Sequence, residues 1–145
     1  MKPKKSTVLT VVSWALVAVC MGIIFFLSAQ NGSGSQTLSD NFTSFLGFPL
    51  YFVRAIRKAA HFLEFTGLAV LFFNALYRSF GRFRPFLSFV LTAAYAASDE
   101  IHQLFVEGRA CRVFDFFVDC AGAATGIAVL YLLIFLFRKL KSRRG

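Results

Sequence analysis

Long apolar runs separated by short polar segments dominate the chain. No charged residue occurs from Thr7 through Gln30, and a run of about 20 apolar residues is enough to cross a bilayer core. The apolar core of a secretory signal peptide is shorter, about 7–15 residues. The run therefore predicts an uncleaved transmembrane helix over about residues 7–29.

Three further apolar segments follow after polar connections. Residues 30–51 begin with a polar, turn-rich stretch and include Gly47 and Pro49, so we expect an irregular or surface-lying loop there. Later segments predict spans over about residues 59–77, 85–102 and 114–137. The third must extend through Asp99 and Glu100 to be long enough. The pattern predicts an all-α integral membrane protein, a four-helix transmembrane bundle that forms a single domain over residues 1–145.

Composition agrees with this class. Hydrophobic residues make up 57% of the chain, charged residues 16%, and the mean hydropathy is +0.65. These values are too apolar for a soluble domain, and 20 Phe residues argue against disorder. Four spans would use roughly 80 residues, so we expect no second, soluble domain.

Basic residues are distributed unevenly between the two predicted sides. Of the 16 Lys and Arg residues, 11 lie before the first span, between the second and third, and after the fourth. Because Lys and Arg accumulate in cytoplasmic loops, we expect both termini in the cytoplasm. The net charge of +9 then reflects orientation in the membrane, so membrane lipids are predicted partners and nucleic acid is not.

All seven acidic residues and both His residues fall on the opposite side. Glu64, Asp99 and Asp119 each lie about five residues inside a predicted span, roughly 7–8 Å into the membrane. Ionisable groups at this depth cost several kcal/mol unless they are paired or hydrated. We therefore expect a polar pocket on the extracytoplasmic side, with these residues facing inward.

Helical spacing indicates which side chains share the pocket. Asp115, Asp119, Gly122 and Gly126 form one narrow stripe, and its Gly-x3-Gly half allows another helix to approach closely. Lys58, His61 and Glu64 share one side of the second span, as do Asp99, His102 and Gln103 in the third, whereas Glu100 points about 100° away from Asp99. The residues predicted to form the pocket are Lys58, His61, Glu64, Asp99, Glu100, His102, Gln103, Arg109, Asp115 and Asp119.

The same residues carry a resemblance to a known family. The segments are Lys58-Ala-Ala-His61-Phe62-Leu-Glu64-Phe65, Ser98-Asp99-Glu100-Ile101-His102-Gln103-Leu104-Phe105, Gly108-Arg109, Asp115-x3-Asp119 and Gly122-x3-Gly126. Their order and spacing over residues 58–126 resemble the VanZ-like family of small bacterial membrane proteins. Glu107 stands where Pro is expected, and Cys111-Arg112 where small polar residues are common.

The resemblance implies a multi-pass protein of the bacterial plasma membrane. The family's namesake is associated with low-level resistance to teicoplanin, which acts at the outer surface of the plasma membrane. We hypothesise that the pocket binds or handles a lipid head group, a lipid-linked cell-wall intermediate or a lipoglycopeptide antibiotic, with Lys58, Arg109 and Arg112 contacting phosphate or carboxylate.

Three alternatives stay open. A membrane-embedded enzyme could use the His and carboxylate side chains to bind a divalent metal and act on a lipid phosphoester, although no metal-binding motif is diagnostic and no cofactor is predicted. A proton-coupled transporter could use the same groups as a relay. A purely structural protein would use them to hold its helices together.

Overall fold

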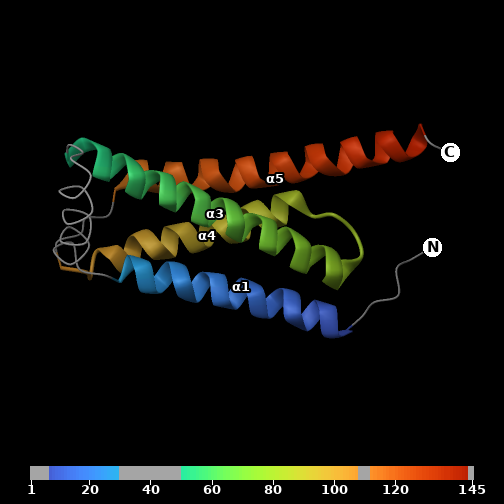
Figure 1. Cartoon of the computed structure of the whole chain (residues 1–145). Coiled ribbons are helices and arrows are strands. Elements are labelled where there is room, and N and C mark those ends of the chain that lie inside the picture. Colours follow the sequence, from blue (N-terminus) through green and yellow to red (C-terminus); the bar gives the residue numbers. More distant parts are fainter. Residues whose placement is uncertain (1–6, 30–49, 108–111, 144–145) are drawn as a thin grey trace, which may run out of the picture.

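Four α-helices make up the described part of the chain. The computed structural model describes residues 7–29, 50–107 and 112–143, with the backbone alone for 50–54. The helices are α1 (Thr7–Ser28), α3 (Leu50–Phe80), α4 (Pro85–Gln103) and α5 (Val113–Ser142), and they run alternately up and down (Figure 1). The start of α1, the α3–α4 turn and the end of α5 lie at one end of the bundle, here the terminal end. We call the opposite end the cluster end.

The all-helical prediction is confirmed, and three helices are long and apolar enough to cross a membrane. These are α1, the Ala55–Phe80 part of α3, and α5. The shorter α4 has 19 residues, and its last turns carry Asp99, Glu100 and His102, which lower its hydropathy. A membrane crossing by α4 therefore stays a prediction.

Two helices extend beyond the predicted spans. The predicted loop ran to Tyr51 and the second span began at residue 59, but α3 already begins at Leu50; the rest of that loop, residues 30–49, lies outside the described residues. At the other extreme, α5 continues past residue 137 to Ser142. Lys and Arg are good helix formers, and cations are favoured at a helix C-terminus. Charge therefore marks the end of an apolar stretch without ending the helix.

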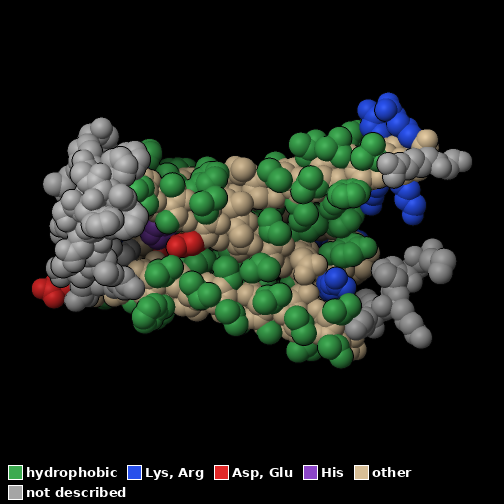
Figure 2. All heavy atoms as spheres, in the orientation of Figure 1, with side chains coloured by type: hydrophobic (Ala, Val, Ile, Leu, Met, Phe, Trp, Pro, Cys, Tyr) green, Lys and Arg blue, Asp and Glu red, His purple; other side chains and the backbone are tan. Residues whose placement is uncertain are grey.

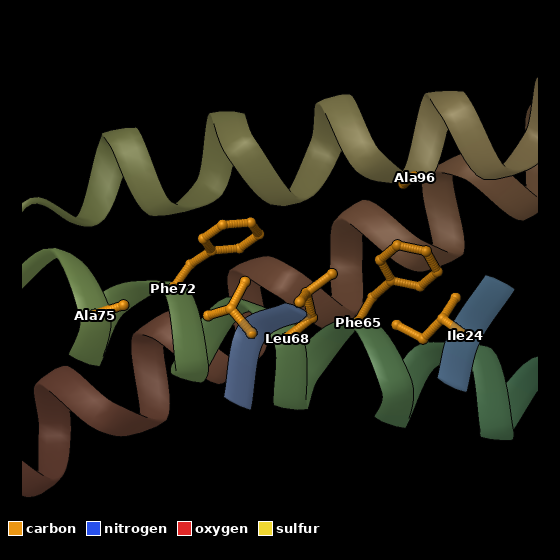
Figure 3. Packing of buried hydrophobic residues seen from close by; sticks show 7 residues of the cluster. Ile24, Phe65, Leu68, Phe72, Ala75 and Ala96 are labelled. Carbon is orange, nitrogen blue, oxygen red and sulfur yellow. The ribbon is translucent and has the colours of Figure 1, made fainter. Parts of the chain in front are cut away.

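The apolar core lies around α3, which packs against the other three helices. Phe65, Leu68 and Phe72 of α3 are buried, and Ile24 of α1 and Ala96 of α4 close over them (Figure 3). Many large apolar side chains of α1 and α5 point outward and are exposed. Such an arrangement is typical of helices that face lipid on most of their surface.

One narrow stripe of α1 packs inward. Its buried residues are Ser13, Val17, Ile24 and Ser28, which share one helical face. Asn74 Nδ2 of α3 donates a hydrogen bond to Ser13 Oγ at 3.1 Å. The apolar pattern of α1 is otherwise nearly uniform, so the two Ser residues help to determine which face of the helix packs inward.

Helices α3 and α5 approach most closely at two Gly residues. A Cβ atom on Gly126 would lie 2.6 Å from the Thr66 carbonyl oxygen, and one on Gly122 would collide with the Phe62 carbonyl oxygen. The Thr66 hydroxyl lies 2.7 Å from that Phe62 oxygen and 2.9 Å from the Gly122 oxygen, within hydrogen-bond distance of both acceptors. This contact fixes the position of α5 along the axis of α3. It lies next to the carboxylates of α5, on the side toward the terminal end.

Candidate polar site at the cluster end

An ion pair joins α3 to the first turn of α5. Lys58 Nζ lies 3.1 Å from Asp115 Oδ1, without the angles of a hydrogen bond, and 4.0 Å from the centre of the Phe114 ring. The Lys58 and Asp115 side chains are 40% and 29% exposed. Because both remain accessible, this pair forms a rim and contributes little to stability.

His61 lies between two carboxylates, one helical turn deeper. Its Nδ1 atom is 3.9 Å from Glu64 Oε2 and 3.8 Å from Asp119 Oδ1. These distances are too long for direct hydrogen bonds. The side chains of His61 and Glu64 are each 23% exposed, whereas that of Asp119 is 1% exposed. His61 therefore stands between the accessible rim and a buried acid.

Asp119 is buried without a hydrogen bond to either of its carboxylate oxygens. Four other carboxylates, those of Glu100, Asp99, Asp115 and Glu64, lie near enough to repel negative charge on it. In the described part of the chain, no Lys or Arg side chain forms an ion pair with Asp119. Buried polar groups are normally satisfied, so this carboxyl group needs a physical explanation.

Asp99 connects α4 to α1. Its Oδ2 atom accepts hydrogen bonds from Ser28 Oγ at 2.8 Å and from Gln103 Nε2 at 3.0 Å, and all three residues are buried. Its Oδ1 atom is buried without a hydrogen bond. The Asp99 carboxyl group is therefore half satisfied, and it holds α1 against α4 at the cluster end.

Glu100 and His102 face different neighbours. Glu100 Oε2 accepts a hydrogen bond from the backbone N–H of Arg112 at 2.9 Å, which ties α4 to the residue that precedes α5. The His102 ring packs against Phe25 of α1 with ring centres 4.2 Å apart, and its Nδ1 atom is buried without a hydrogen bond.

The structure brings most of the predicted site residues to one end of the bundle, in two linked groups. Lys58, His61 and Glu64 of α3 meet Asp115 and Asp119 of α5, while Asp99, Glu100 and Gln103 lie on α4. Arg109 lies outside the described residues. On the face shown in Figure 2, acidic and His side chains lie toward the cluster end, and Lys and Arg gather at the terminal end. We refer to the residues around Asp119 as the acidic cluster: His61, Glu64, Asp99, Glu100, Asp115 and Asp119.

Three contacts of the predicted site residues were not expected from the sequence. Ser28 is a polar residue near the end of an apolar run, and that position is a signal that sequence reasoning could have used. Arg112 was expected to act through its guanidinium, but its backbone N–H contacts Glu100. Phe25, which packs on His102, has no distinguishing signal among so many Phe residues.

Metal binding was an alternative for these side chains. Within the described ranges, no group of three His, Cys, Asp or Glu side chains is arranged to hold a metal ion.

A comparison with protein families shows the family of this chain. The family model described as VanZ/LLP1 matches residues 13–137, most of the chain. The chain belongs to the VanZ/LLP1 family. The resemblance in the polar segments is thus confirmed, and the VanZ/LLP1 match also includes most of α1, which carries none of those segments. Neither a curated protein nor a solved structure matches this VanZ/LLP1 chain significantly.

Proposed function

We propose that this VanZ/LLP1 membrane protein binds the polar head group of an amphiphile at the acidic cluster, on the extracytoplasmic side of a bacterial plasma membrane. Candidate ligands are a lipid head group, a lipid-linked cell-wall intermediate and a lipoglycopeptide such as teicoplanin. Both termini lie in the cytoplasm in this proposal, as the distribution of Lys and Arg favours.

The observation that carries the proposal is the state of Asp119. Its side chain is 1% exposed, and neither oxygen accepts a hydrogen bond. Leaving a buried polar group unsatisfied costs about 1–3 kcal/mol, and more for a charged group. A ligand that donates hydrogen bonds to this carboxyl group would remove that cost. His61, 3.8 Å away and partly exposed, lies at the side from which such a ligand would approach.

The charges around the site favour a head group that carries an ammonium. Asp119, Glu64 and Asp99 would attract a cation in a medium where charges are weakly screened. At the rim, Lys58 is 40% exposed and could exchange Asp115 for a phosphate or carboxylate of the ligand. A zwitterionic or amine-bearing head group has both features.

The test compares teicoplanin susceptibility in a sensitive Gram-positive host that produces the wild type or a variant at equal membrane abundance. We expect the wild type to protect the host, and Asp119→Asn and His61→Gln to lose that protection. Glu107→Gln is the matched control, because it makes the same carboxylate-to-amide change at an exposed residue near the cluster end.

Each outcome has a defined meaning. Protection by Asp119→Asn equal to that of the wild type would contradict binding at the acidic cluster. Absence of protection by the wild type would remove teicoplanin as the ligand. Failure of Asp119→Asn and His61→Gln to accumulate in the membrane, with normal Glu107→Gln, would indicate that the acidic cluster mainly stabilises the helices.

A further inference from the structure

A second group of unusual contacts lies at the terminal end, far from the acidic cluster. Helix α3 ends at Phe80, and Gly81 adopts a φ of 68°, a left-handed conformation that Gly accommodates without strain. Pro85 begins α4. The resulting turn is short, and it places Phe83 and Arg84 next to the last turns of α3.

Phe83 connects this turn to α3 and α5. Its ring stacks on Tyr77 and Phe73 of α3, with centres 4.7 Å and 5.4 Å away, and lies 6.4 Å from Tyr131 of α5. Arg138 follows Tyr131 by two helical turns, and its guanidinium lies 5.6 Å from the centre of the Phe83 ring. The aromatic contacts therefore bring a basic residue of α5 to the α3–α4 turn.

Arg84 is held in a similar way. Its guanidinium lies 4.3 Å from the centre of the Phe80 ring, and its Nε atom is buried without a hydrogen-bond acceptor. In the part of the chain that the structure describes, neither Arg84 nor Arg138 forms an ion pair with a carboxylate. Two guanidinium groups are thus positioned on rings while their charges remain without an anion.

We propose that the guanidinium groups of Arg84 and Arg138 bind phosphates of anionic phospholipids in the membrane leaflet at the terminal end. Guanidinium groups present a planar set of donors that fits phosphate oxygens, and contact with ring faces orients them. The orphaned Nε atom of Arg84 supplies a donor that lacks an acceptor. Phe80 and Phe86, which are 50% and 79% exposed, offer an adjoining apolar surface for the acyl chains. A soluble phosphate ion would not use that surface.

The test measures lipid retention on the purified full-length protein by native mass spectrometry. Phosphatidylglycerol, phosphatidylcholine and inorganic phosphate are added separately, and phosphate is also added in competition with phosphatidylglycerol. We expect preferential retention of phosphatidylglycerol, weakened about tenfold by Arg84→Gln or Arg138→Gln. Arg143→Gln is the matched control, since it removes the same charge at the same end and no ring contact of Arg143 occurs among the described residues.

Several results would overturn the proposal. Equal retention of phosphatidylcholine would exclude recognition of an anionic head group, and displacement of the lipid by inorganic phosphate would indicate a site for soluble anions. An equal loss in Arg143→Gln would indicate diffuse attraction by the basic end. Should Arg84→Gln fail to fold, Arg138→Gln at its exposed position decides the question, and an unchanged retention there would overturn the proposal. The acidic cluster takes no part in this site, so either proposal can fail without the other.

Discussion

At Gly126, the absence of one Cβ atom determines how closely α5 packs on α3. The two backbones are near enough that the smallest side chain would press on the Thr66 carbonyl group. A Cβ atom on Gly67, which follows Thr66 in α3, would have no atom within 4 Å. Two Gly residues at a similar depth therefore have different roles, and the difference depends only on what faces them.

We expect Gly126→Ala to destabilise the protein by about 1–3 kcal/mol, because α5 must move away from α3 to accept the methyl group. Gly67→Ala, with open space around it, should be neutral or stabilising by up to about 1 kcal/mol, because Ala favours the helix. Thermal unfolding of both variants in detergent checks this pair. Equal stability of the two variants would contradict the close contact.

Asp115 and Asp119 also differ in their surroundings although they lie on the same helical face. Helical spacing predicted that Asp115 and Asp119 share one stripe, and it could not distinguish their surroundings. Asp115 meets Lys58 at an accessible rim, whereas Asp119 lies one turn deeper without a hydrogen bond. The depth of a side chain depends on the neighbouring helices, which the spacing within one helix does not contain.

At the scale of the element, only a few residues of α1 are buried against the other helices. Its outward face is apolar and exposed, and its buried residues all lie on the stripe that begins at Ser13 and ends at Ser28. Ser28 donates to Asp99 of α4 at 2.8 Å. This hydrogen bond couples the end of α1 to the polar end of α4.

We expect Ser28→Ala to lower the free energy of unfolding by about 1–3 kcal/mol, because Asp99 loses one of its two donors in a buried position. Ser98→Ala is the control: Ser98 is exposed and bonds to Tyr95 within its own helix. That change should stay within about 0.5 kcal/mol of the wild type. Thermal unfolding in detergent measures both, and a silent Ser28→Ala would show that the hydrogen bond does not hold α1.

Helices α3 and α5 both extend beyond their apolar stretches into charged residues. Apolar composition locates the middle of each helix, whereas the predicted spans end where charged residues begin. The backbone continues through Arg57 and Lys58 at one end of the bundle and through Arg138 and Lys139 at the other. Helical hydrogen bonding depends on backbone geometry, whereas the membrane boundary depends on solvation, so the two need not coincide.

At the scale of the whole molecule, the alternation of helices places the start of α1 and the end of α5 at one end of the bundle (Figure 1). The α3–α4 turn, with its Arg residues, lies at that same end. If α4 crosses the membrane together with α1, α3 and α5, the two ends of the bundle face opposite compartments. The excess of Lys and Arg then predicts that the terminal end is cytoplasmic.

Labelling of single Cys residues tests this topology. In a background with the natural Cys residues replaced, an impermeant thiol reagent applied to intact cells should label Glu107→Cys and leave Ser142→Cys and Arg82→Cys unlabelled. All three positions are exposed in the bundle. Labelling of Arg82→Cys and Glu107→Cys from the same side would show that α4 does not cross. Labelling of Ser142→Cys and Arg82→Cys without labelling of Glu107→Cys would invert the orientation.

By itself, the sequence determined the helical class, the approximate place of each helix and the family, because apolar runs and motif spacing are local properties of the chain. It also indicated which helical faces carry carboxylates. Only the tertiary structure decided that Asp119 is buried without a hydrogen bond, that Ser28 supports Asp99, and that Arg138 reaches Phe83. Those facts depend on contacts between residues far apart in the chain, and the height at which the helices pack sets those contacts.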